Sequence, residues 1–110
     1  MPVKVKSLLP TFAALAILGS AGSAAFAAPP DAAHGEQLAR RWCAACHIVA
    51  YDQTKGADNV PTFSAISKAP GRDAARIAQF LRDPHPKMPD MQLSVPETQD
   101  LAAYIVSLGK

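Results

Sequence analysis

The sequence predicts an all-α fold of about four helices. Almost no stretch of the chain alternates apolar and polar residues with the period of two that a half-buried β-strand requires. Apolar residues instead recur every three or four positions, in segments that begin with capping residues and end near glycine or proline. No internal repeat is visible in the second part of the chain. We therefore expect one helical domain, preceded by a segment of a different kind.

That preceding segment, residues 1–27, has the pattern of a cleavable secretory signal peptide. Lys4 and Lys6 form a positive start, and the apolar run Leu8–Leu18 follows. The segment closes with small residues in the cleavage pattern Ala25–Ala27. An uncleaved membrane anchor is the alternative, but a spanning helix needs about 20 strongly apolar residues and only the first half here is strongly apolar. We expect cleavage after Ala27 and export of residues 28–110 to the periplasm.

The exported chain would carry no net charge. The whole sequence has 11 basic and 9 acidic residues, and two of the basic ones lie in the leader. The remaining 83 residues hold nine of each sign. Such a balance provides no basic surface for nucleic acid or for an anionic membrane. We expect no nucleic-acid binding and no membrane anchoring after cleavage.

The first helix is predicted to begin at Asp31, which can cap it, and to run to about Cys46. Four of its residues share one face and are expected to point inward: Gly35, Leu38, Ala39 and Trp42. A polar loop follows from His47 to Val60.

Three further helices are expected after this loop. Thr62–Lys68 is short and presents Phe63 and Ile66. Asp73–Arg82 follows Gly71 and has three inward positions: Ile77, Phe80 and Leu81. The last helix begins with the capping box Ser94–Glu97, which has a proline near its start, and Gly109 can end it. Its predicted inward stripe consists of Leu101, Tyr104, Ile105 and Leu108.

The most informative motif is Cys43-Ala44-Ala45-Cys46-His47. Cys-x-x-Cys-His is the pattern through which a haem is attached covalently. Each thiol can add to one vinyl group of the porphyrin, and the histidine that follows can bind the iron. A disulfide or a thioredoxin-like redox pair is the alternative for two cysteines in an exported protein. Neither needs His47, and no strand is predicted beside the motif. We therefore predict one haem c, bound to Cys43 and Cys46, with His47 as an iron ligand.

The second axial position separates an electron carrier from a site that binds oxygen or peroxide. Four candidate side chains lie in the proline-rich loop before the last helix: His85, Lys87, Met88 and Met91. A thioether is a weak ligand that its loop must hold in place, and the prolines on both sides of Met88 reduce the entropy lost on ligation. We predict Met88 as the ligand. Met91 remains an alternative ligand, and so does His85, which would give bis-histidine ligation. Lys87 is expected to be solvated.

The motif, the methionine loop and the terminal helix together resemble the small soluble class I cytochromes c of bacteria, over residues 35–108. The resemblance implies a class I cytochrome c fold wrapped around one haem. It implies that Gly35 lets the first helix cross the last one closely, opposite Tyr104. It further implies that the carbonyl of Pro61 accepts the ring N–H of His47, which would fix the tautomer of that ring.

Two departures from the family pattern affect the expected contacts. Many members have an aromatic residue where this chain has Ala39, and several hold a haem propionate with a mid-chain tryptophan, whereas Trp42 lies beside the cysteines. The propionate partners stay unassigned among four candidate arginines: Arg40, Arg41, Arg72 and Arg76.

The resemblance implies a periplasmic one-electron carrier with His47 and Met88 on the iron, and not an enzyme. Such carriers dock briefly through small, weak contacts. The implied partners are a membrane oxidase, a quinol-oxidising complex or a periplasmic dehydrogenase. Two alternatives stay open: a dedicated electron-accepting subunit of a dehydrogenase, and a haem enzyme or gas sensor with an open sixth position, for which His85 is the available nearby histidine.

Overall fold

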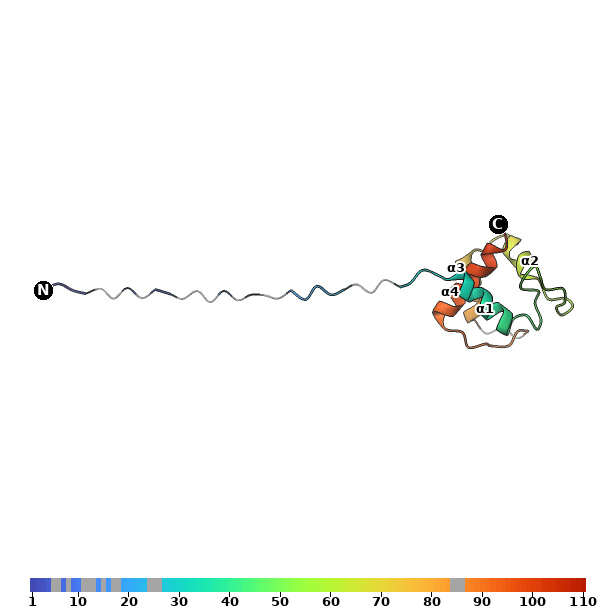
Figure 1. Ribbon diagram of the computed structural model, residues 1–110, viewed down its shortest axis with the longest axis horizontal. Coiled ribbons are helices and arrows are strands. Elements are labelled where there is room, and N and C mark those ends of the chain that lie inside the picture. The colour runs from blue at the N-terminus through green and yellow to red at the C-terminus, as the bar shows by residue number, and fades with distance from the viewer. Residues whose placement is uncertain are drawn as a thin grey trace.

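A computed structural model describes residues 1–4, 7, 9–10, 14, 16, 19–23, 27–83 and 87–110. Its elements are α1 (Ala32–Trp42), α2 (Phe63–Lys68), α3 (Ala74–Arg82) and α4 (Val95–Ser107), and the described residues contain no β-strand. Figure 1 shows these helices gathered into one domain, with the described residues before α1 extending away from it. No helix in the described ranges is both long enough and apolar enough to cross a bilayer. The predicted all-α fold is confirmed.

Each helix begins where a capping side chain satisfies its first free N–H groups. Asp31 accepts hydrogen bonds from the backbone N–H groups of Ala33 and His34, at 2.9 and 3.1 Å. Thr62 and Asp73 cap α2 and α3 in the same way. At α4 the predicted capping box is present, because the backbone N–H of Ser94 donates to the Glu97 carboxylate and the Glu97 N–H donates to the Ser94 hydroxyl.

Helix α1 is shorter than predicted, since it ends at Trp42 rather than near Cys46. The backbone N–H groups of Cys43 and Ala44 both donate to the carbonyl of Ala39, which ends the regular ladder. A separate turn follows, in which the N–H groups of Cys46 and His47 donate to the carbonyl of Cys43, at 3.2 and 2.8 Å. The cysteine motif therefore lies in a hydrogen-bonded turn directly after the helix.

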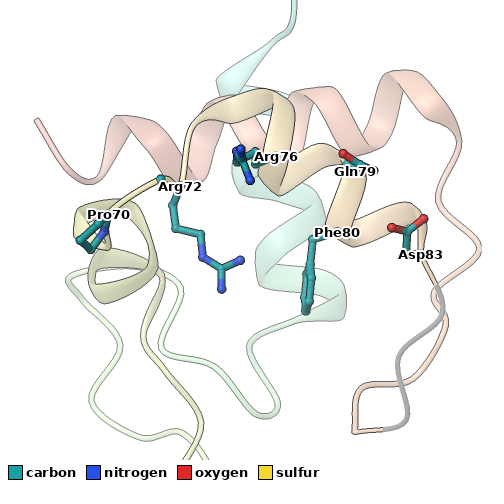
Figure 2. A pocket seen from close by; sticks show the side chains of 7 residues that line it. Pro70, Arg72, Arg76, Gln79, Phe80 and Asp83 are labelled. Atoms are coloured by element: carbon teal, nitrogen blue, oxygen red, sulfur yellow. The ribbon is translucent and has the colours of Figure 1, made fainter.

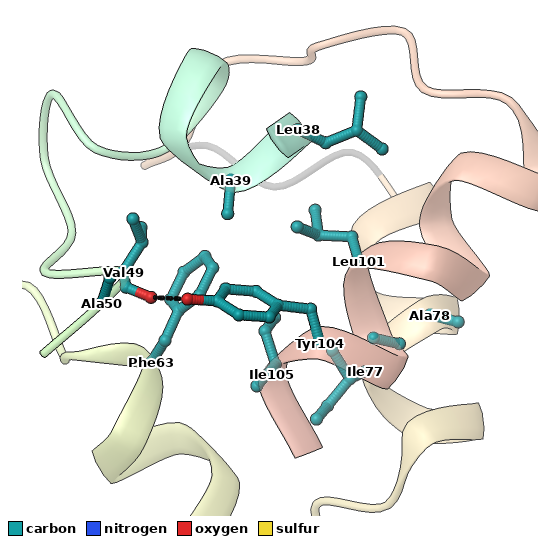
Figure 3. Close-up of a cluster of buried hydrophobic side chains, with 11 residues drawn as sticks. Leu38, Ala39, Val49, Ala50, Phe63, Ile77, Ala78, Leu101, Tyr104 and Ile105 are labelled. Carbon is teal, nitrogen blue, oxygen red and sulfur yellow. Dashed lines mark hydrogen bonds between the residues drawn. The ribbon is translucent and has the colours of Figure 1, made fainter. Parts of the chain in front are cut away.

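The core forms where α1 and α3 pack against α4 (Figure 3). Its buried apolar residues are Leu38, Ala39, Val49, Ala50, Phe63, Ile77, Ala78, Leu101, Ala102, Tyr104 and Ile105. The crossing of α1 over α4 is close at Gly35, where a Cβ atom would lie 2.1 Å from the backbone oxygen of Asp100 and 2.9 Å from Cβ of Tyr104. The expected close crossing of the first and last helices at Gly35, opposite Tyr104, is confirmed.

Two side chains predicted to point inward do not. Trp42 is 42% exposed and Phe80 is 44% exposed. Trp42 is the last residue of α1, and the guanidinium of Arg41 lies 4.8 Å from the centre of its ring. Helix α3 faces α4 through Ile77 and Ala78, which places Phe80 on the flank of this contact.

Candidate functional site

The two cysteines of the turn differ in environment. Cys43 is half-buried and Cys46 is exposed, and no disulfide joins them. Burial raises the pKa of the Cys43 thiol to about 11. A thioredoxin-like pair needs a thiol whose pKa is lowered so that the thiolate forms near neutral pH. The environment of Cys43 therefore argues against a dithiol redox site.

The ring of His47 is held by the carbonyl of Pro61, whose oxygen lies 2.6 Å from Nδ1. A carbonyl oxygen can only accept, so the proton of the neutral ring must sit on Nδ1. This contact is the one expected from the family resemblance. It leaves the lone pair on Nε2, which has no hydrogen-bond partner among the described residues. His47 is thus in the tautomer that can bind a metal ion through Nε2.

A chain of aromatic contacts connects His47 to the helical core. The centres of the His47 and Phe63 rings are 5.3 Å apart, and those of Phe63 and Tyr104 are 6.5 Å apart in an edge-on arrangement. The hydroxyl of Tyr104 donates to the buried carbonyl of Val49 at 2.6 Å, the dashed contact in Figure 3. The ring of His47 therefore packs on residues that are fixed by α2 and α4.

The loop after the motif folds back against it. The backbone N–H of Ala57 donates to the carbonyl of Cys46 at 2.7 Å. A Cβ atom on Gly56 would lie 2.9 Å from that same carbonyl oxygen, so only glycine fits there without a shift. The side chain of Gln53 bonds to this loop and to the motif, and no sequence pattern had indicated a role for it.

An open cavity of about 400 Å³ lies along α3 and the residues before it. Figure 2 shows Arg72 and Phe80 pointing into the same space, and the guanidinium of Arg72 lies 5.8 Å from the centre of the Phe80 ring. Arg76 also lines this cavity. Arg40, by contrast, pairs with Glu36 and Asp52. Of the four arginines considered from the sequence, Arg72 and Arg76 are the two that line the cavity.

The methionine loop is only partly described. His85 and its neighbouring prolines lie outside the described residues. Met88 and Met91 are both half-buried, and Lys87 is exposed as expected. Burial does not separate the two methionines, so Met88 as a ligand stays a prediction. Within the described ranges no group of three or more His, Cys, Asp or Glu side chains could hold a metal ion.

The donor set nevertheless fits a porphyrin-bound iron. Two cysteines lie in one turn, an imidazole whose Nδ1 is bound to a carbonyl and whose Nε2 remains available follows directly, and a cavity with an apolar ring and two arginines lies along α3. A porphyrin brings its own four nitrogen ligands and needs from the protein only axial donors and a lined cavity.

Comparison with known proteins gives two matches. A family model described as cytochrome c oxidase, cbb3-type, subunit III, matches residues 30–105. The cytochrome c-552 of Bradyrhizobium diazoefficiens is 47% identical over 92 residues, which cover 84% of this chain and 88% of that protein. No solved structure matches the chain significantly.

Proposed function

This chain belongs to the family of small monohaem cytochromes c, and from that membership we propose the residues through which it works and the place where it does so. As a c-type cytochrome it has a covalently bound haem c and acts as an electron carrier. We assign haem attachment to Cys43 and Cys46, and axial ligation to His47 and Met88. The observation that carries this assignment is the 2.6 Å contact between Nδ1 of His47 and the carbonyl oxygen of Pro61. It puts the ring proton on Nδ1 and leaves the lone pair of Nε2 available to bind iron, directly after the two cysteines.

The bound haem supplies an iron that exchanges one electron between Fe(III) and Fe(II). The chain's own residues hold the iron ligand His47 in one position during this electron exchange. Pro61 fixes the tautomer of the His47 ring and makes its free nitrogen a stronger donor. Phe63 packs against the same ring and limits its rotation. Rigid surroundings suit a carrier, because little has to rearrange when the charge changes.

The cavity along α3 has side chains suited to a porphyrin edge. The ring of Phe80 is 44% exposed and lines this cavity, where it offers an apolar surface. Arg72 and Arg76 supply positive charge for the propionate carboxylates. Arg40 is already paired with two carboxylates and is less suited to this role.

The cytochromes c of this family act outside the cytoplasm and exchange electrons with respiratory complexes. We propose that residues 1–27 are removed as a signal peptide and that residues 28–110 work in the periplasm as a carrier and not as an enzyme. A membrane oxidase, a quinol-oxidising complex or a periplasmic dehydrogenase would exchange electrons with it in brief encounters.

A second candidate is a stably bound electron-accepting subunit of a respiratory complex or dehydrogenase. It is favoured by the matching family model, whose description names an oxidase subunit. Purification from a host membrane in mild detergent distinguishes a bound subunit from a free carrier. A subunit elutes with its complex, whereas a carrier elutes alone.

The axial ligand is tested by Met88→Ala, with Met91→Ala as the matched control. We expect Met88→Ala to keep its haem, to lose the weak sulfur–iron absorption band and to bind carbon monoxide readily. Loss of a soft neutral ligand should lower the midpoint potential by at least about 59 mV, a tenfold change in the one-electron equilibrium. Retention of the band in Met88→Ala and its loss in Met91→Ala would move the assignment to Met91.

Attachment is tested by Cys43→Ala and Cys46→Ala. Each variant can form at most one thioether, so we expect much less haem to stay with the chain on a denaturing gel. Wild-type amounts of linked haem in both variants would contradict the assignment.

A further inference from the structure

We propose that Gln53 is a positioning residue for the iron ligand His47, an inference that rests on the proposed role of His47. The side-chain NH₂ of Gln53 donates to three backbone carbonyls, those of Ala44 at 3.0 Å, His47 at 2.7 Å and Lys55 at 2.8 Å. Its side-chain oxygen accepts the backbone N–H of Val49 at 2.9 Å. One half-buried amide thus connects four points of the backbone on both sides of His47.

The orientation of this amide is determined by its partners. An NH₂ group has two hydrogens, which three carbonyls share, and the side-chain oxygen can only accept. Turning the Gln53 amide over would place its oxygen against three carbonyl oxygens and its NH₂ group against the N–H of Val49. Each of these contacts would be repulsive. The network therefore admits one orientation.

The four bonds restrain the backbone of His47 from two directions. The carbonyls of Ala44 and His47 belong to the turn that holds the cysteines, and Val49 begins the segment that leads away from it. The carbonyl of Val49 is itself bound by the Tyr104 hydroxyl of α4. Gln53 thereby links the motif to a position that the helical core already fixes.

This restraint matters because the His47 ring must meet two partners at once. Its Nδ1 has to reach the Pro61 carbonyl, and its Nε2 has to point to the iron. A strong Nδ1–H bond makes the imidazole a better donor and stabilises Fe(III) relative to Fe(II). Without the restraint from Gln53 the ring samples more orientations and the bond to Pro61 weakens on average. The midpoint potential should then rise.

The test compares Gln53→Met with Gln99→Met in the haem-loaded protein. Methionine has a similar length and cannot make these hydrogen bonds, and Gln99 is exposed on α4. We expect Gln53→Met to shift the one-electron equilibrium toward Fe(II) by about threefold to tenfold, the upper value being 59 mV. The haem methyl resonances of the oxidised protein, which depend on the orientation of the axial imidazole, should change as well. Gln99→Met should leave both unchanged.

A lowered melting temperature with unchanged potential and unchanged methyl resonances would show a purely structural role and overturn the proposal. If Gln53→Met does not fold, hydrogen exchange in the wild-type protein tests the restraint by Gln53 instead. The side-chain amide protons of Gln53 should exchange at least about tenfold more slowly than those of Gln99. Equal rates would also overturn it. The proposed function fails by a different result, namely the absence of covalent haem. The hydrogen-exchange comparison of Gln53 with Gln99 can be made whatever the iron ligands are, so the two failures are distinguishable.

Discussion

Replacement of Gly35 by alanine tests the close crossing of α1 over α4. The added Cβ atom would lie 2.1 Å from the backbone oxygen of Asp100 and 2.6 Å from its carbonyl carbon. These are main-chain atoms and cannot rotate away, so α4 has to move. Movement would also strain the bonds that tie Asp100 to the start of α1, where it accepts from the Asp31 N–H at 2.7 Å and contacts His34 Nδ1 at 2.8 Å.

The expected size of the effect follows from two opposing contributions. Overpacking a well-filled contact costs about 1–3 kcal/mol, and a backbone obstacle this close places Gly35→Ala at the upper end. Alanine gains about 1 kcal/mol over glycine in helix propensity. The net loss in the free energy of unfolding is about 2 kcal/mol. For a domain of this size that lowers the melting temperature by roughly 8–16 °C.

Thermal and guanidinium unfolding of the haem-loaded protein, followed by circular dichroism, would measure this loss. Gln37→Ala is the matched control, because Gln37 is exposed on the same helix. It should change stability by less than about 0.5 kcal/mol. If Gly35→Ala is as stable as Gln37→Ala, the two helices are not in backbone contact at Gly35 and the proposed crossing is wrong.

Two further predictions concern hydrogen bonds in the same region. Tyr104→Phe leaves the buried carbonyl of Val49 unpaired and should lower the free energy of unfolding in guanidinium by about 1–2 kcal/mol. The control Tyr51→Phe, at a residue that is 76% exposed, should lower it clearly less. Equal losses in the two variants would contradict this prediction. The hydrogen bond to Asp100 raises the pKa of His34 above 6.5, and the Asp31 N–H together with His34 lowers the pKa of Asp100 below 3.8. The stability that wild type gains over His34→Gln should therefore be largest between pH 3.8 and 6.5 and shrink as the pH rises through the folded-state pKa of His34. A difference that grows above pH 6.5 would show that the charged pair is not its source.

Local signals in the sequence were sufficient for the helices and the attachment motif. Capping residues such as Asp31 and Ser94 act on backbone groups within four positions, so their effect is visible in the sequence. The Cys43–His47 spacing is likewise a local requirement of haem attachment. The end of α1 was less predictable, because a continued helix and a turn differ there by a few backbone hydrogen bonds around Ala39.

The inward positions were predicted less well at helix edges. Ile77 is buried as expected, but Phe80 lies on the flank of α3 and Trp42 at the end of α1. Periodicity gives the apolar side of a helix, and the width of the contact with its neighbour decides which residues of that side are covered.

The sequence by itself determined the all-α class, the helix starts and the residues able to bind a haem, because each depends on neighbours within a few positions. Only the tertiary structure decided which distant groups meet. The family resemblance had implied two such contacts, between the Pro61 carbonyl and the ring of His47 and between the two helices at Gly35, and the structure confirms both. The four partners of Gln53 came from the structure alone. These contacts depend on how the loops fold back over the core, and no short-range pattern encodes that path.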